Sequence, residues 1–402
     1  MKKVIIIGGG ASGLVCAIVA ARRGECVTIL EKSNNCGKKI LVSGNGRCNY
    51  WNSEFDITKF NSNNLDILEY ILKNKDNVLP FFESLGIIPK IKNGYYYPYS
   101  NQSITVLNAL INELKRLNVN IEYDVEIVDI IKNNNSFYLI SSNKKYVCDY
   151  VVVSTGSNAY VKDNTCGYDM LKRLGHSLIK PLPALVQLKG NDSCFKDWAG
   201  IRCDVNLSLY VNDKFIKCEI GEVQLTNYGI SGICAMQLSS MISRCLYNNE
   251  KCMIKINFLN FLNSLEEFID WLKCQSKKTN NKTIQELLDC VFNYKLTNII
   301  LKKSGIKNNK LVEQLTSNEL TVLAQNVISF DIEIIDTMTF KESQVCSGGI
   351  PLCEINKDTL ESLKVKNLYL TGEILDVDGN CGGYNLGFAW ISGIIVGNSI
   401  GR

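Results

Sequence analysis

A loop near the N-terminus combines glycines with a cation and a thiol. Residues 36–52 read CGKKILVSGNGRCNYWN, in which Gly44 and Gly46 precede Arg47 and Cys48. Glycines at this spacing allow successive backbone N–H groups to turn toward an anion. The guanidinium of Arg47 can neutralise a pyrophosphate or hold charge near a reacting group. We expect this segment to line an anionic ligand; the alternative is an exposed SGNG hairpin turn.

The segment before this loop has the pattern of a dinucleotide-binding βαβ unit. The apolar run 4–7 predicts a strand buried on both faces, and Gly8, Gly10 and Gly13 follow it before a helix-like segment. These glycines permit a tight turn, close approach of a pyrophosphate, and packing of the helix on the strand. Glu31 closes the next strand, where it would accept hydrogen bonds from ribose hydroxyls and repel a 2′-phosphate. The pattern predicts tightly held FAD or NAD rather than NADP.

Two further segments favour a flavin. Residues 149–159, DYVVVSTGSNA, predict a buried strand that ends in a Ser-Thr-Gly turn. Residues 366–402 predict a strand, a TGE turn, a glycine-rich loop and a final helix that begins near Asn385. The first amides of that helix can face the edge of an isoalloxazine ring, where negative charge accumulates on reduction. A ligand that meets both ends of the chain is long enough to be FAD.

At this point the sequence resembles the BaiN/YhiN-like (aminoacetone oxidase-like) family of FAD-dependent oxidoreductases. The motifs that carry the resemblance span nearly the whole chain: GGGASG at 8–13, GKKILVSGNGRCN at 37–49, CGYDMLKRLGHS at 166–177, LTNYGISG at 225–232, CSGGIPLCEI at 346–355 and TGEILDVDGNCGGYNLGFAW at 371–390. The resemblance implies a Rossmann-type FAD domain, an inserted β domain and a small helical domain. It also implies bulky apolar substrates such as oxidised bile-acid intermediates.

The local patterns agree with that layout. Apolar residues alternate along 201–211, which predicts a half-exposed antiparallel strand. Ser264 with Glu267, and Thr283 with Glu286, have the spacing of capping boxes that open helices. We therefore expect an α/β fold with a discontinuous Rossmann-type FAD-binding domain, an inserted antiparallel β domain and a helical subdomain. The expected ranges are 1–184 with 341–402, 185–260 with 327–340, and 261–326, respectively.

Cofactor-binding residues are predicted from the motif positions and the resemblance together. The set is Gly8, Gly10, Ala11, Ser12, Gly13, Glu31, Lys32, Lys39, Ser43, Gly44, Gly46, Arg47, Cys48, Ile127, Thr155, Gly156, Gly372, Glu373, Gly383, Tyr384, Asn385 and Leu386. No catalytic residue is assigned. The candidates are Tyr384, Asp376, Asp378 and Arg47, and for the first three we favour cofactor contact or loop capping over acid catalysis.

The thiols and the histidine are expected to be structural. There are 17 cysteines but no CxxC pair, so no resolving cysteine accompanies Cys48. We expect Cys48 to pack near the cofactor, although the cation beside it would lower the pKa of its thiol. His176 is the one histidine, which excludes multi-histidine metal sites, and no metal is expected. Asn227 stands where relatives often have histidine, which leaves an acid role there in doubt.

Composition limits the class of protein. The 402 residues suggest two or three domains, and the net charge is only +4. The cysteine usage points to a reducing cytoplasm, the opening apolar run is too short for a signal peptide, and no segment has the roughly 18 apolar residues of a membrane helix. Without a basic-aromatic stripe, we expect a small-molecule substrate rather than nucleic acid. The oligomeric state is not predicted.

Three functions remain open from the sequence. The first is a reductase that passes electrons from NADH or NADPH to an activated C=C bond, as in an enone, or to a related small organic acceptor. Because no second GxGxxG is present, the nicotinamide nucleotide would dock only transiently. The second is an oxygen-using flavin amine oxidase. The third is a flavin-binding module that partners with RNA or protein.

Overall fold

The computed structural model describes residues 2–160, 167–279 and 282–401, and it divides into two compact units. One comprises Met1–Leu182 and Val345–Arg402, here called the Rossmann unit, and the other comprises Pro183–Gln344, here called the barrel unit. Each has its own hydrophobic core. The predicted domain limits fall near these divisions, and a separate helical domain within the barrel unit stays a prediction.

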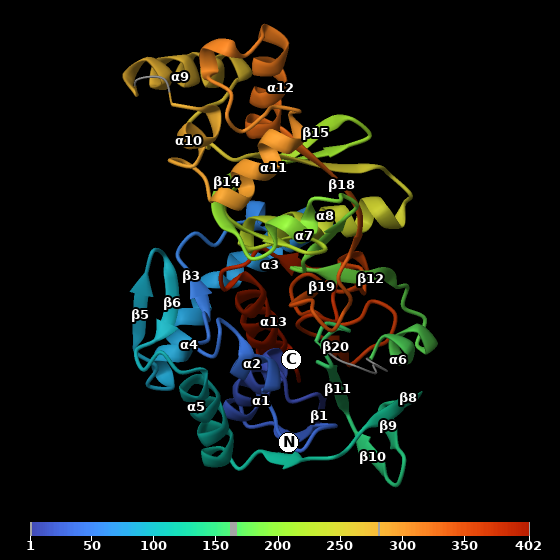
Figure 1. The fold of residues 1–402 in the computed structure, drawn as a ribbon. Helices are drawn as coiled ribbons and strands as arrows, with labels where there is room; N and C mark the ends of the chain where they lie inside the picture. The colour runs from blue at the N-terminus through green and yellow to red at the C-terminus, as the bar shows by residue number, and fades with distance from the viewer. Residues whose placement is uncertain (1, 161–166, 280–281, 402) are drawn as a thin grey trace. The chain divides into compact units, whose positions relative to one another are not determined.

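The Rossmann unit is built on a five-stranded parallel sheet (Figure 1). Its strand order is β20 (Leu368–Leu370), β11 (Tyr150–Val153), β1 (Lys3–Ile7), β2 (Cys26–Leu30) and β7 (Asn120–Glu122). The central strands β1 and β11 are almost entirely buried and apolar, as a parallel sheet covered on both faces requires. The predicted Rossmann-type sheet is confirmed.

Helix α1 (Ala11–Arg22) packs closely against the last helix, α13 (Tyr384–Ser399). Gly393 and Gly397 of α13 make this possible, because an added Cβ would lie 2.5 Å from the Ser12 carbonyl oxygen and 2.6 Å from Val19 Cβ, respectively. A third helix, α5 (Ser103–Arg116), packs on α1 as well. The two ends of the chain are thus joined by helix packing in which backbones nearly touch.

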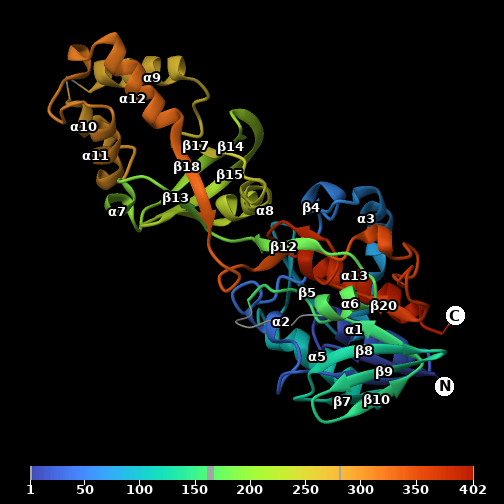
Figure 2. The same cartoon turned by 90° about the vertical axis from the view of Figure 1, so that its right-hand side faces the viewer.

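Smaller elements complete the Rossmann unit (Figure 2). Strands β8 (Ile127–Asn133), β9 (Ser136–Ser141) and β10 (Lys145–Cys148) form one antiparallel sheet, and β3 (Trp51–Asn52), β6 (Tyr95–Pro98) and β5 (Pro89–Lys92) form another. Strand β4 (Phe60–Asn61) pairs with β21 (Asp378–Gly379). The remaining elements are α2 (Lys38–Val42), η1 (Ile57–Lys59), α3 (Leu65–Leu72), η2 (Lys73–Asn77), α4 (Val78–Ser84), α6 (Tyr168–Arg173), β19 (Val345–Gly349) and η4 (Leu352–Glu354). Strand β12 (Ile179–Ala184) begins in this unit and ends two residues beyond its limit at Leu182.

The barrel unit contains a closed six-stranded barrel. Its strands follow the order β13 (Leu188–Gly190), β16 (Gly229–Ser231), β15 (Lys214–Thr226), β14 (Arg202–Val211), β17 (Cys252–Asn257) and β18 (Phe330–Thr337). Helix α8 (Ile233–Tyr247) contacts every one of these strands, and α7 (Phe195–Trp198) packs on β15. The inserted antiparallel β structure predicted from residue alternation is confirmed.

Helices also form where the sequence predicts them. They are α9 (Leu265–Lys278), α10 (Ile284–Leu288), α11 (Tyr294–Lys303), the short η3 (Val312–Gln314) and α12 (Ser317–Ile328). Thr283 and Glu286 form the predicted capping box. Ser264 caps α9 through the Glu267 N–H, but the Glu267 carboxylate accepts from the Asn263 N–H instead of the Ser264 N–H, so that predicted box is only half formed.

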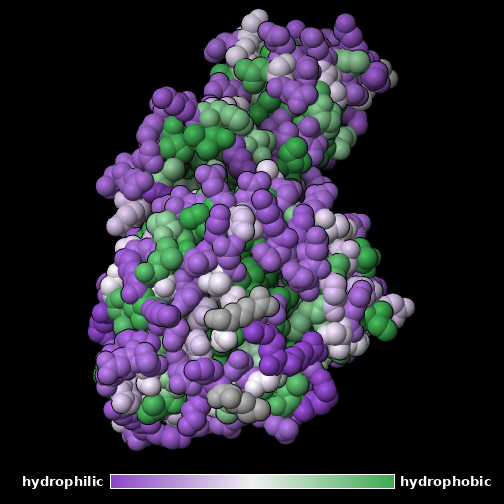
Figure 3. All heavy atoms as spheres, turned by 180° about the vertical axis from the view of Figure 1, so that it is seen from behind, coloured by the Kyte–Doolittle hydropathy of each residue, from purple (hydrophilic) through white to green (hydrophobic). Residues whose placement is uncertain are grey.

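In the described part of the chain, no helix is long and apolar enough to cross a membrane. On the face drawn in Figure 3, hydrophilic side chains predominate and apolar ones are scattered among them.

Candidate cofactor site

The glycine loop after β1 is held tightly by the protein itself. Gly8 N–H donates to the Leu30 carbonyl at 2.9 Å, and Gly9 N–H donates to Glu31 Oε2 at 2.7 Å. An added Cβ at Gly13 would lie 2.2 Å from the Gly8 carbonyl oxygen, so only glycine allows this turn. Glu31 therefore already braces the loop, and its predicted contact with a ribose stays a prediction.

Gly10 differs from its neighbours, because nothing in the chain requires glycine there. Its backbone is extended, with φ −80°, and an added Cβ would meet only the Ser154 carbonyl oxygen, at 3.9 Å. The space in front of Gly10 opens at the N-terminus of α1, where free N–H groups and a partial positive charge favour phosphate. This cradle fits the pyrophosphate of a dinucleotide.

Residues 43–47 follow the short helix α2 and form a succession of turns rather than a hairpin. Gly44, Asn45, Gly46 and Cys48 all have positive φ. The Ser43 carbonyl accepts from the Cys48 N–H at 3.0 Å. Burial raises the pKa of the Cys48 thiol to about 12, which favours a packing role over a thiolate.

The Arg47 side chain is exposed beside this loop. Its Nε donates to the Gly44 carbonyl at 3.3 Å, and its guanidinium carbon lies 5.3 Å from the centre of the Tyr97 ring. The arginine is exposed, as the hairpin alternative predicts, but the loop itself is not a hairpin. Contact of Arg47 with a cofactor stays a prediction.

An unpartnered acceptor lies where this loop approaches α13. Asn49 Oδ1 is buried and has no hydrogen-bond partner. An added Cβ at Gly383, the residue that precedes α13, would lie 3.2 Å from this oxygen. Free helix amides and an orphan carbonyl acceptor are therefore neighbours. They match the pyrimidine edge of a flavin, which presents an N–H between two carbonyl oxygens.

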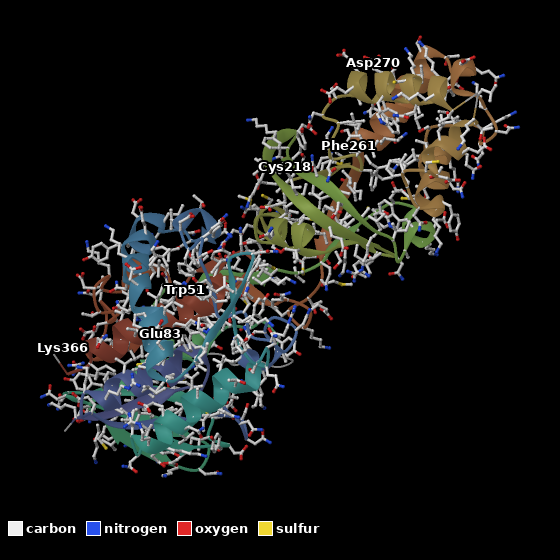
Figure 4. All side chains as sticks on the ribbon, turned by 90° about the vertical axis from the view of Figure 1, so that its left-hand side faces the viewer. Trp51, Glu83, Cys218, Phe261, Asp270 and Lys366 are labelled. Carbon is white, nitrogen blue, oxygen red and sulfur yellow. The ribbon has the colours of Figure 1, made fainter. Side chains whose placement is uncertain are left out.

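Aromatic side chains support the start of α13. Trp51 and Phe55 stack with ring centres 4.2 Å apart, and the Tyr384 ring lies 5.7 Å from Phe55 and 5.8 Å from Phe60. Figure 4 shows Trp51 beside α13. Burial, and then the nearby Tyr95, raise the pKa of Tyr384 to about 12, so the phenol keeps its proton at neutral pH.

Asp376 and Asp378 are buried and hold a neighbouring segment. Asp376 Oδ2 accepts from the Asn63 N–H, and Asp378 Oδ2 accepts from Asn61 Nδ2, each at 2.9 Å. Asn385 closes the adjoining loop through bonds to the Gly379 N–H and carbonyl, at 2.8 and 2.7 Å. These bonds favour a loop-positioning role for both carboxylates.

Other predicted residues join the glycine loop to the TGE turn. Ser12 Oγ donates to the Thr371 carbonyl at 3.3 Å, and the Gly372 N–H donates to Ser392 Oγ at 3.0 Å. Lys39 forms a salt bridge with Glu373.

The remaining predicted residues occupy separate places in the Rossmann unit. Thr155 Oγ1 accepts from the Gly167 N–H at 3.0 Å, next to Gly156. Ile127 begins β8 with its side chain in the core, Leu386 packs against the core from the start of α13, and Lys32 is exposed after β2. In the barrel unit, Asn227 lies exposed in the turn between β15 and β16. By sequence, Asn49 is an uncharged donor of the motif at 37–49 but is not in the predicted cofactor-binding set; only the fold shows that its oxygen lacks a partner.

Comparison with known proteins identifies the family. A model of the HI0933-like protein Rossmann domain matches residues 2–399. The chain belongs to this family. A 3-dehydro-bile acid delta(4,6)-reductase of Clostridium scindens is 36% identical over 99% of both chains. A ribosomal RNA dihydrouridine synthase of Haemophilus influenzae is 27% identical over 99% of this chain and 98% of its own.

A solved structure shows the same fold. The 3-ketosteroid delta1-dehydrogenase of Sterolibacterium denitrificans matches with a TM-score of 0.51 and 11% identity over 99% of both chains. Membership of the HI0933-like family confirms the predicted resemblance, enzyme class and cofactor. The protein is an FAD-dependent oxidoreductase, and the roles of its individual site residues remain predictions.

Proposed function

We propose that this oxidoreductase reduces a C=C bond conjugated to a carbonyl group in a small organic molecule, with electrons from NADH or NADPH. The observation that carries the proposal is the near full-length likeness to the bile acid reductase of Clostridium scindens. A 3-dehydro group is a ketone, so the double bonds in that enzyme's name are conjugated to a carbonyl. Dihydrouridine, in the name of the Haemophilus relative, also arises by reduction of a C=C bond conjugated to a carbonyl.

The proposed cofactor contacts follow from the two observations that fit FAD. The cradle at Gly10 and the N-terminus of α1 would hold the pyrophosphate, and Asn49 with the first amides of α13 would hold the pyrimidine edge of the flavin. When bound there, FAD supplies the two-electron transfer. The amides of α13 would stabilise negative charge at that edge, and the aromatic side chains behind them would exclude water.

Tyr384 is the proposed proton donor. Its raised pKa keeps the phenol protonated, whereas Asp376 and Asp378 already accept hydrogen bonds from the chain. A phenol at the start of α13 would deliver a proton to the α-carbon as a hydride reaches the β-carbon, and the phenolate would then regain a proton from water. Arg47 is exposed and is not assigned to proton transfer.

A small molecule is favoured over RNA as the substrate. The barrel unit has 18 Lys and Arg residues against 18 Asp and Glu residues, so it lacks the excess of positive charge that binds a phosphate backbone. The 16 cysteines in the described part of the chain are free thiols, which supports a cytoplasmic site of action.

An anaerobic experiment tests the function. The yellow protein is mixed with NADH or NADPH, and bleaching of the flavin is followed; a steroid 4-en-3-one or 4,6-dien-3-one is then added. The proposal predicts bleaching by one nucleotide, and return of the yellow colour with one equivalent of a product that has one C=C bond fewer than the added steroid. Reduced flavin that no enone reoxidises would contradict the proposal, and peroxide formation with an amine and oxygen would favour an amine oxidase.

A further inference from the structure

The hairpin of β5 and β6 places lysines and tyrosines on one face. Lys90 pairs with Tyr97 and Lys92 pairs with Tyr95 across the two antiparallel strands. Residues two apart on a strand share a face, so these four side chains project from the same side. Arg47 lies over the Tyr97 ring at the same place. We call this set, with Tyr99 beside it, the hairpin face.

The fold assembles this surface from two stretches that lack acidic residues. Residues 32–53 contain four Lys or Arg and no Asp or Glu, and residues 84–112 contain two Lys and no Asp or Glu. The structure joins the two stretches: the Ser103 N–H donates to the Gly46 carbonyl at 2.8 Å, and the Tyr50 N–H donates to the Tyr96 carbonyl at 2.9 Å. No basic-aromatic stripe is visible in the linear sequence, because strand pairing rather than sequence order brings these residues together.

The cations of the hairpin face are available to a ligand. Arg47, Lys90 and Lys92 are exposed, and within the part of the chain that the structure describes none of them forms an ion pair. Tyr95 and Tyr99 are exposed to 37% and 70%, which leaves ring surface for stacking. Exposed cations beside exposed aromatic rings recognise a phosphate that carries a planar base.

The hairpin face also adjoins the proposed flavin site. Asn52 of β3 donates to the Gly382 carbonyl at 2.9 Å, and an added Cβ at Gly382 would lie 2.8 Å from the Tyr95 ring. Gly382 immediately precedes Gly383, beside which the orphan oxygen of Asn49 lies. A ligand on the hairpin face would therefore reach the start of α13 without leaving the Rossmann unit.

We propose that the hairpin face binds the adenosine and phosphate portion of the nicotinamide nucleotide that donates electrons. Arg47, Lys90 and Lys92 bind the phosphates, and Tyr97 with Tyr95 or Tyr99 stacks on the adenine. Three cations in one small face suit a dinucleotide with two or three phosphates, whereas an RNA duplex or strand requires a longer basic track. This explains how a chain with one GxGxxG motif can use two dinucleotides.

The inference rests on the proposed function, and rapid mixing under anaerobic conditions tests it. The rate of flavin reduction is measured against the concentration of NADH and of NADPH in wild type and in the Lys90→Ala and Lys92→Ala double variant. We expect the nucleotide Kd to rise roughly tenfold or more with the limiting rate unchanged. A larger loss with NADPH would place its 2′-phosphate on these cations, and an equal loss would assign them to the pyrophosphate.

Matched controls isolate the hairpin face. N-benzyl-1,4-dihydronicotinamide lacks phosphates and adenosine, so it should reduce wild type and variant equally. Lys366→Ala removes one charge far from Trp51 and β3 in the same unit (Figure 4), and it should leave the nucleotide Kd unchanged. Tyr97→Ala should raise the Kd, whereas Tyr97→Phe, which keeps the ring, should not.

The outcomes separate this inference from the proposed function. An unchanged nucleotide Kd in the double variant overturns the inference. The inference is also overturned if the double variant binds the nucleotide normally but no longer binds a 20-nucleotide mixed-sequence RNA. If flavin reduction by the nucleotide depends on the hairpin face, but no enone reoxidises the reduced flavin, the inference is supported and the proposed reaction is rejected. If neither nucleotide reduces the wild-type protein, but dithionite reduces it and an enone then reoxidises it, the inference is rejected and the proposed enone reaction is retained.

Discussion

Lys39 forms a salt bridge with Glu373 and thereby ties helix α2, which comes after β2, to the turn that follows β20. The Glu373 carboxylate also accepts from the Cys346 N–H through its second oxygen, at 3.3 Å. One carboxylate thus links three segments that are far apart in sequence. Lys39 and Glu373 are both predicted to bind the cofactor, and in the structure they form a salt bridge with each other.

Removing the charge of Glu373 should have a small effect on the apoprotein. The pair is partly exposed, so Glu373→Gln or Lys39→Ala should cost less than about 1 kcal/mol of unfolding free energy. Glu373→Ala should cost about 1 kcal/mol more, because it also removes the acceptor for the Cys346 N–H. Urea unfolding of the apoproteins measures this, with Lys38→Ala, on the neighbouring exposed lysine, as control. Equal losses for Glu373→Gln and Glu373→Ala would show that the bond to Cys346 contributes nothing.

Gly10 and Gly13 should respond to alanine in opposite ways. Gly13→Ala places a methyl group 2.2 Å from the Gly8 carbonyl, so the apoprotein itself should be destabilised. Gly10→Ala fits the apoprotein, with backbone φ −80°, and should unfold within about 0.5 kcal/mol of wild type. It should nevertheless raise the Kd for FAD at least tenfold, since the methyl group fills the cradle. Thermal unfolding and absorbance titration with FAD measure the two effects. Normal FAD affinity in Gly10→Ala would remove the pyrophosphate from this position.

Local sequence patterns predict the elements of this fold better than they predict how the elements meet. The buried strand before Gly8 and the last helix follow from hydrophobic period and glycine position, and α13 begins at Tyr384, one residue before the predicted start. The contact of Gly393 and Gly397 with α1 has no such signal, because their partners lie in a helix near the other end of the chain. The hairpin face was missed for the same reason: antiparallel pairing brings Lys90 beside Tyr97, which the linear sequence does not.

Asn49→Ala should separate cofactor affinity from stability. In the apoprotein Asn49 Oδ1 is buried without a partner, so its removal should leave the unfolding free energy unchanged or slightly raised. If that oxygen accepts the flavin N–H, the same variant should raise the Kd for FAD about tenfold and shift the visible flavin spectrum. Asn52→Ala is the control: its amide donates to Gly382 at 2.9 Å, so the apoprotein should lose stability. A destabilised Asn49→Ala apoprotein would indicate an ordinary structural asparagine.

Tyr384→Phe should impair only the step in which the substrate accepts a proton. The ring packs against Phe55 and Phe60, and phenylalanine preserves those contacts. Reoxidation of the reduced enzyme by an enone should slow about 10²-fold, the range typical for loss of a general acid, while reduction by the nicotinamide nucleotide keeps its rate. The two half-reactions are measured separately by stopped-flow absorbance. Equal rates of reoxidation in the two proteins would assign Tyr384 to packing alone.

Stability should fall on acidification because of a buried network around His176. His176 Nδ1 and Nε2 lie 2.8 Å from Glu354 Oε2 and Ser362 Oγ, respectively. Burial lowers the pKa of His176 below its usual 6.5, only partly offset by Glu354. Burial opposes the charged form of Glu354, but hydrogen bonds from Lys364, Ser177 and His176 together lower its pKa to about 2.

Both groups bind protons more readily in the unfolded chain than in the folded one. The contribution of His176 is therefore fully present above about pH 6.5 and is lost as the pH falls through its lower folded pKa; that of Glu354 is lost between about pH 4.5 and 2. His176→Gln removes the imidazole that titrates in this range. With FAD held constant, the thermal midpoint of this variant should therefore drop less than that of wild type between pH 7.5 and 5.5. Ser362→Ala, which keeps the histidine, should retain the wild-type pH slope. If His176→Gln and wild type gave parallel curves, the acid sensitivity would have to arise elsewhere in the chain.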